Sequence, residues 1–75
     1  MNKEQRKRLA ELYDELSSVL DEIEQIKEDE ECKYDNLPES LQDSEKGEQL
    51  QEGIDALDDV YSYLSDSISS LESVL

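Results

Sequence analysis

The chain has 75 residues, 22 of them acidic and 7 basic, which gives a formal net charge of −15. A chain this short forms one domain, residues 1–75, and its core is marginal unless something adds to it. The charge excludes a broad basic face for nucleic acid and argues against an anionic membrane surface. No apolar run matches a membrane span or a signal peptide, and the single Cys32 fits a reducing compartment. We therefore expect a cytoplasmic protein with no direct nucleic-acid or membrane partner.

The first part of the chain carries a regular apolar pattern. Leu9, Leu16 and Ile23 occupy position a of a heptad, and the d positions and the flanking e positions are also apolar. The d residues are Leu12, Val19 and Ile26, and the e residues are Tyr13 and Leu20. No Gly or Pro interrupts residues 2–34, so the pattern predicts a helix over about residues 3–32. Its stripe is wider than a and d alone, which is typical of a helix that contacts two neighbours in a bundle.

A connection is expected over about residues 33–36. Pro38 disfavours helical geometry at Leu37 but suits the first turn of a helix. Asn36 is a good N-cap, and Glu39 three residues later can complete a capping box. These residues predict that a second helix begins near residue 37.

The second helix is predicted over about residues 37–74. From Leu50 to Leu75 the apolar spacings alternate four and three, with leucine at every d position. Val60 at g broadens the stripe, and Gly53 at g would let a neighbouring helix come close. The pattern fits either one helix with a possible kink near Gly47 or a short helix over 37–45 that bends there.

Two helices of similar length with a short connection lie antiparallel. The predicted fold is therefore all-α, an antiparallel helical hairpin with heptad seams. A lone hairpin leaves part of its wide apolar stripes exposed to solvent, so we expect two copies to form a homodimeric four-helix bundle. A solitary hairpin is the alternative. The predicted core and dimer residues are Leu12, Leu16, Val19, Ile23, Leu57, Tyr61, Leu64, Ile68 and Leu71.

The sequence offers little for catalysis. It has no histidine, which removes the commonest general base and the commonest metal ligand. Cys32 follows four acidic residues, which raise a thiol pKa and disfavour a reactive thiolate. The acidic runs lack a calcium-loop pattern, and the two glycines form no phosphate loop. We predict no enzyme activity, no metal and no cofactor.

Charge is unevenly distributed. Residues 1–8 carry four bases and one acid, a net of +3, so the other 67 residues carry −15 − 3 = −18. In an antiparallel hairpin the basic segment should lie beside Glu72 and the terminal carboxylate and pair with them. Rows of carboxylates on the second helix either keep the protein soluble or imitate nucleic-acid phosphates inside a basic cleft. The acids of interest are Glu52, Asp55, Asp59 and Asp66.

The middle of the chain resembles a known block. The runs Asp29-Glu30-Glu31, Tyr34 to Gln42 (YDNLPESLQ) and Ser44-Glu45 are similar to a segment of uncharacterised short acidic helical proteins encoded by phages and prophages of Gram-positive bacteria. The resemblance implies a small accessory protein that binds a host protein, such as a component of antiviral defence, and inhibits or redirects it. A structural or assembly coiled-coil module and an acidic nucleic-acid mimic are the alternatives. The predicted recognition tip comprises Tyr34, Asn36, Leu37, Pro38 and Glu39, although Asn36 and Pro38 are also what a helix start needs.

Overall fold

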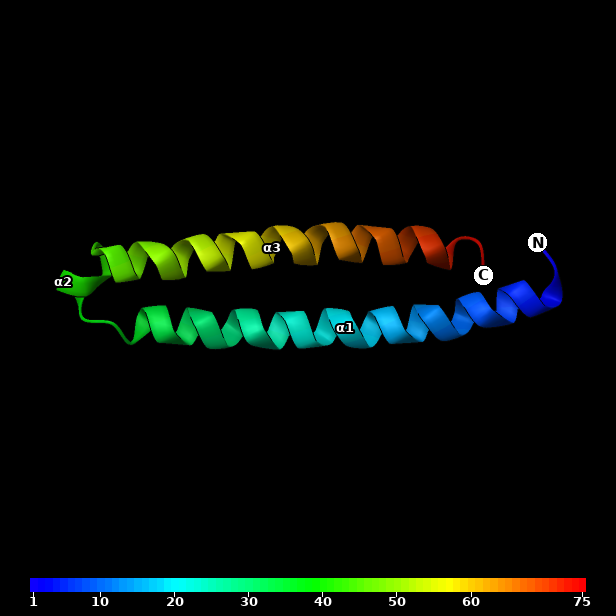
Figure 1. Cartoon of the computed structure of the whole chain (residues 1–75), viewed down its shortest axis with the longest axis horizontal. Coiled ribbons are helices and arrows are strands. Elements are labelled where there is room, and N and C mark those ends of the chain that lie inside the picture. Colours follow the sequence, from blue (N-terminus) through cyan, green and yellow to red (C-terminus); the bar gives the residue numbers. More distant parts are fainter.

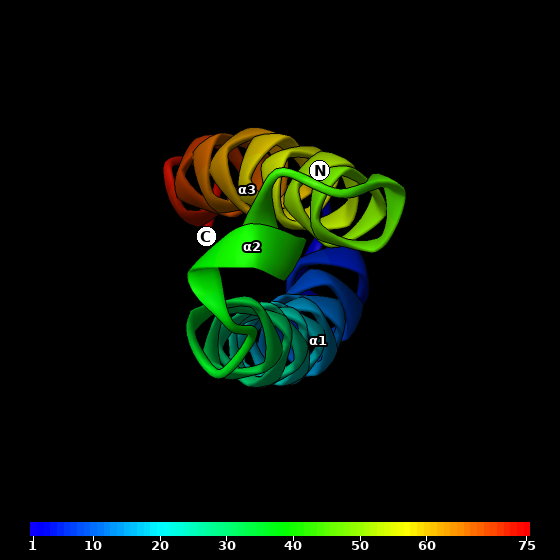
Figure 2. The same cartoon turned by 90° about the vertical axis from the view of Figure 1, so that its left-hand side faces the viewer.

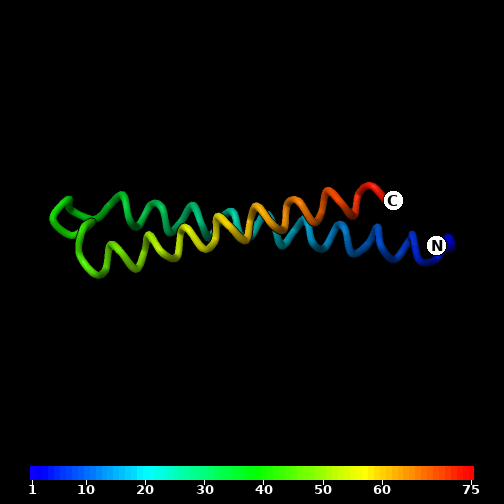
Figure 3. Tube along the Cα trace, turned by 90° about the horizontal axis from the view of Figure 1, so that it is seen from above, coloured from blue at the N-terminus to red at the C-terminus, as the bar shows by residue number.

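The computed structural model describes all 75 residues and contains only helices. Helix α1 (Lys3–Asp35) and helix α3 (Glu45–Glu72) lie antiparallel, and the short α2 (Glu39–Gln42) closes one end between them (Figures 1 and 2). The molecule is a rod with extents of 58 × 14 × 13 Å. Seen from above, the two long helices cross near the middle of the rod (Figure 3). The predicted all-α helical hairpin is confirmed.

Helix α1 begins where a capping box forms. The side chain of Asn2 accepts a hydrogen bond from the backbone of Gln5 at 2.8 Å, and the Gln5 side chain accepts one from the backbone of Asn2 at 3.0 Å. This reciprocal pair satisfies two N–H groups that a helix start leaves without partners. With no Gly or Pro in the way, the helix then runs for 33 residues.

The end of α1 differs from the sequence prediction. Asn36 does not cap the next helix; it is the C-cap of α1, and its backbone N–H still donates to the carbonyl of Cys32 at 3.0 Å. The helix therefore extends to Asp35 rather than ending near residue 32. Pro38 precedes α2 as its N-cap without any side-chain cap, so the expected capping box between Asn36 and Glu39 is absent. Asn is common at both ends of helices. Here the backbone N–H of Asn36 bonds to the free carbonyl of Cys32, so Asn36 belongs to the end of α1.

Of the two alternatives for the second helix, the single helix over 37–74 is wrong. A separate short helix, α2, is present as in the other alternative, but the chain turns at 43–44 rather than bending at Gly47, and α3 begins only after Ser44. The Ser44 hydroxyl caps α3 by accepting from the backbone of Gly47 at 3.5 Å. Gly47 is not a kink; it is a buried residue in the first turn of α3, where the α2 backbone passes directly over it. A Cβ at Gly47 would stand 2.0 Å from the carbonyl oxygen of Gln42. Any residue other than glycine would therefore collide with the α2 backbone.

The core lies along the single interface between α1 and α3. Ile54 and Ile68 at the a positions of α3 are 8% and 7% exposed, and only Gly47 is otherwise buried. Most predicted core residues are half-buried, as expected for a two-helix interface: Leu12, Leu16, Ile23, Leu57, Tyr61, Leu64 and Leu71.

Helix α1 is rotated relative to the predicted seam. Its a and e columns face α3, while two of its d residues, Val19 and Ile26, are 44% and 53% exposed. The predicted a and d seam of α1 is therefore wrong, because columns a and e contact α3 instead. A stripe three columns wide cannot be covered by one neighbour, and α3 covers the side that includes e.

Candidate functional site

One flank of α3 is free of charge. From Gln49 to the C-terminus, the two columns beside the leucine seam, c and g, hold only uncharged residues: Gln49, Gly53, Ala56, Val60, Tyr63, Ser67, Ser70 and Val74. All eight are exposed, with Val60 at 46% and Tyr63 at 72%. The acids of α3 all lie on its other columns. In a chain with a net charge of −15, an uncharged strip along a whole helix is the surface best suited to close contact with another protein.

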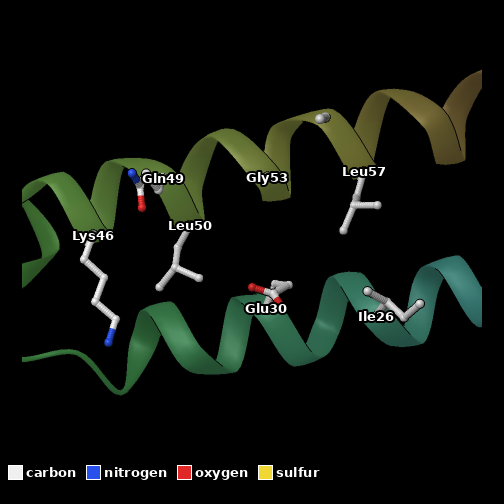
Figure 4. Close-up of a pocket in the computed structure, with 8 residues that line it drawn as sticks. Ile26, Glu30, Lys46, Gln49, Leu50, Gly53 and Leu57 are labelled. Atoms are coloured by element: carbon white, nitrogen blue, oxygen red, sulfur yellow. The ribbon is translucent and has the colours of Figure 1, made fainter.

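Helix α1 adds the exposed part of its own stripe to this flank. Ile26 lies across a shallow groove from Leu50, Gly53 and Leu57, and Figure 4 shows Leu50 and Leu57 pointing from α3 toward α1 with Ile26 below Leu57. A Cβ added at Gly53 would meet no atom within 4 Å, so space remains beside the helix. We define the open face as Val19 and Ile26 of α1 with Gly53, Ala56, Val60, Tyr63, Ser67 and Val74 of α3.

The opposite flank is polar and holds the ion pair between the two long helices. The Lys27 ammonium contacts Asp58 at 2.9 Å, the one ion pair that joins α1 to α3, and Glu31 at 3.8 Å. It also lies 5.8 Å from the centre of the Tyr61 ring, and its side chain is only 22% exposed. The hydrogen bond to Asp58 raises the pKa of Lys27 above its usual value, and the charges of Asp58, Glu31 and Glu24 act in the same direction against a smaller opposing effect of desolvation. Sequence patterning missed this cation, because Lys27 stands at an e position that was expected to face water.

The predicted recognition tip lies at one end of the rod and is partly used to hold itself together. Tyr34 and Leu37 are half-buried, whereas Asn36, Pro38 and Glu39 are exposed. The side chain of Gln42 donates to the backbone carbonyls of Tyr34 and Leu37, both at 3.3 Å, and so ties α2 to the end of α1. Neither Gln42 nor its role was singled out from the sequence, because amide side chains carry no periodic signal. What the tip leaves free for a partner is the edge formed by Asn36, Pro38 and Glu39.

The four acids singled out on α3 lie on columns b and f, away from the open face. Glu52, Asp55, Asp59 and Asp66 are all exposed, and none forms an ion pair with a Lys or Arg. The amide of Gln51 donates to Asp55 at 2.9 Å. No three Asp, Glu or Cys side chains converge in a way that could hold a metal ion.

The basic N-terminal segment is also free. Its side chains are exposed, and its one ion pair joins Arg8 to Glu11 at 3.0 Å within α1. The expected pairing with Glu72 or the terminal carboxylate is absent. The reason is geometric: α1 projects beyond the end of α3, so the first turns of α1 have no α3 beside them (Figure 1).

These features define a class of molecule: an elongated acidic helical hairpin with an open face whose α3 strip is uncharged, one polar face and oppositely charged ends. No family model, curated protein or solved structure matches the chain. Neither long helix has a stretch apolar enough to cross a membrane.

Proposed function

We propose that the chain is a non-catalytic protein-interaction module that works as a homodimer, in which two hairpins pack their open faces together as a four-helix bundle. The observation that carries this proposal is the open face itself. Only three residues of the hairpin are buried, while Val19, Ile26 and Val60 remain 44–53% exposed on one flank.

The partner outside the dimer is proposed from the middle block. Its resemblance to phage and prophage proteins supports a small cytoplasmic protein of an infected or lysogenic bacterium that binds a host protein, such as a component of antiviral defence, and inhibits or redirects it. The exposed edge of Asn36, Pro38 and Glu39 supports the tip as the contact. A structural role, with the bundle scaffolding a larger phage or host complex, is the alternative if no host partner exists.

A second candidate function rests on the acids of column f. Glu52, Asp59 and Asp66 are exposed, unpaired and one heptad apart, or about 10.5 Å between neighbours. Such a row could occupy a basic cleft in place of nucleic acid. The carboxylates of this row are farther apart than the phosphates along one strand of DNA. The row therefore carries a lower density of negative charge than a duplex does.

The dimer is tested with two matched variants. Ser67 on the open face and Ser69 on column b are both exposed residues of α3, so Ser67→Asp and Ser69→Asp make the same chemical change to the same helix. Light scattering after size exclusion should give twice the 8.7 kDa chain mass for the parent and for Ser69→Asp, and a monomer for Ser67→Asp. A parent protein that stays monomeric at high concentration refutes the dimer.

The partner is tested by affinity capture from a Gram-positive host lysate with low-salt and high-salt washes. One host protein that survives high salt, and is lost from a Pro38→Ser, Glu39→Lys variant, supports the tip. Many nucleic-acid-binding proteins that are lost as salt rises, or with Glu52, Asp59 and Asp66 changed to amides, support mimicry. Capture of no host protein refutes host binding.

A further inference from the structure

We propose that the second copy docks on the open face with its ends reversed, so that the basic N-terminal segment of each copy lies along the acidic tip of the other. This inference rests on the proposed homodimer and specifies its orientation. Two hairpins can pack face to face with their tips at the same end or at opposite ends, and both arrangements bring the open faces together. In the reversed arrangement the two α3 helices overlap over their C-terminal halves. The distribution of charge along the rod separates them.

The two ends of the hairpin carry opposite charge. Residues 1–8, at the end away from α2, have four basic and one acidic side chain, a net of +3. Residues 28–52, which form the end of the rod around α2, have ten acids and two bases, a net of −8. Packing the tips together would place the −8 charge of residues 28–52 of one copy beside the same charge of the other. Reversing one copy places the +3 charge of residues 1–8 beside the −8 charge of the other copy at both ends of the bundle. This attraction favours association and sets the orientation.

The lengths match this arrangement. Val19 stands in the middle of the exposed d column of α1, 17 residues after Asn2 and 17 before Asn36, or about 26 Å from each. A two-fold axis that passes beside Val19 and lies across the rod therefore brings the N-terminus of one copy level with the tip loop of the other. Because α1 projects past α3, the basic turns reach this position without hindrance from their own chain (Figure 1).

The same axis pairs complementary residues on the open face. Along α1, Val19 lies level with Val19 of the second copy, and Ile26 lies level with the second copy's Leu12. The exposed d column of each copy is therefore covered by the d column of the other. On α3, the Lys27–Asp58 ion pair places Val19 near the level of residues 64–66, so the exposed Tyr63 ring falls beside the small Ser67 of the second copy. No acid of α3 enters this contact.

Charged residues on the flank of α1 both favour and oppose association of the two copies. Arg8 and Asp29 share column g, and the reversed copy brings Arg8 near the level of the other copy's Asp29. Glu15 and Glu22 share the same column and approach their counterparts, which opposes association. The ends therefore have to supply the preference, and because these charges are exposed the preference weakens with salt.

The reversed dimer makes each end of the bundle a composite surface. The exposed tip edge of one copy, Asn36, Pro38 and Glu39, lies beside the basic segment of the other, so a partner that binds the tip also meets cations that its own chain cannot supply. Each bundle then carries two equivalent binding ends about 50 Å apart, a separation set by the 58 Å rod.

The orientation is tested with the protein's own cysteine. Cys32 is the only cysteine and is exposed, so a nitroxide can be attached to it without any substitution. Thirteen residues separate it from Val19, so pulsed electron paramagnetic resonance should give about 40 Å between the two labels in the reversed dimer. Labels in the same-end dimer lie on neighbouring helices of one bundle end, under about 25 Å apart.

Light scattering on the same labelled sample separates the two proposals. A monomeric mass refutes the homodimer and the orientation with it. A dimeric mass with a short label distance refutes only the orientation. A dimeric mass with a distance of about 40 Å supports both.

A charge-reversal pair provides an independent check. Arg8→Glu should raise the dimer dissociation constant about fivefold or more at low salt, because two equivalent contacts are reversed, and less at high salt. Adding Asp29→Lys should recover most of that loss. Both residues are exposed, so the hairpin should keep its helical circular dichroism. An unchanged dissociation constant for Arg8→Glu, or no recovery in the double variant, overturns the proposed contact.

Discussion

The two glycines of α3 should respond in opposite ways to the same substitution. Replacing a glycine inside a helix by alanine normally stabilises the helix by about 1 kcal/mol. At Gly53 nothing lies within 4 Å of the added Cβ, so Gly53→Ala should realise that gain. At Gly47 the added Cβ would lie 2.0 Å from the carbonyl oxygen of Gln42 and 2.7 Å from that of Leu41. Gly47→Ala should therefore destabilise the hairpin.

The cost at Gly47 follows from what has to move. Ordinary contact begins at 3.4 Å, so the backbone of α2 must shift by about 3.4 − 2.0 = 1.4 Å. No side chain can rotate to relieve the contact, because the obstructing atoms are carbonyl groups. Overpacking of this kind costs about 1–3 kcal/mol. The shift also strains the two 3.3 Å hydrogen bonds from Gln42 to the carbonyls of Tyr34 and Leu37, each worth about 1 kcal/mol. After the gain in helix propensity, the expected net loss is about 1–3 kcal/mol.

The assay compares both alanine variants in the Ser67→Asp background, where self-association is expected not to contribute. Urea and thermal unfolding are followed by circular dichroism, and light scattering checks that every sample is monomeric. The midpoint of thermal unfolding should rise by about 4–8 °C for Gly53→Ala and fall by a similar or larger amount for Gly47→Ala. If both variants shift the midpoint upward, α2 does not pack on α3 as described, and the account of Gly47 is refuted.

Three further predictions concern the polar flank, the tip and the core. The raised pKa of Lys27 means that the stabilising contribution of its ammonium is complete below the unfolded-state pKa near 10.5 and is lost as pH rises through the higher folded-state value. Stability should therefore fall above about pH 10.5 more steeply in the parent than in Lys27→Met, and equal slopes would contradict this. Gln42→Glu removes both N–H donors to the carbonyls of Tyr34 and Leu37 and should lower the free energy of unfolding by about 1–2 kcal/mol, whereas the same change at the exposed Gln49 should have little effect. Chemical unfolding distinguishes them, and equal effects would contradict the role assigned to Gln42. Ile54→Ala should lower the free energy of unfolding by about 2–4 kcal/mol, because Ile54 is only 8% exposed in the interface, and a loss under 1 kcal/mol would show that the interface is not formed.

The helical hairpin itself follows from the sequence. Apolar spacings of three and four, an uninterrupted first segment and Pro38 after it predicted two long helices and a connection, and the structure contains them. Periodicity of this kind is local information, because every residue reports on its own face of its own helix. The exposure of Asn36, Pro38 and Glu39 could also be expected, since they stand where the chain reverses.

Tertiary structure alone decided which part of each stripe is covered and where the second helix divides. The a, d and e columns of α1 are largely apolar, and a sequence cannot say which two a single neighbour will cover. In the structure α3 covers a and e, with Lys27 paired to Asp58, and Val19 stays exposed. The division at residues 43–44 depends on α2 folding back over Gly47, a contact between backbones with no side-chain pattern to announce it. Local preferences fix the elements because they act within one helix, whereas rotation and close backbone approach depend on the neighbour that each helix meets.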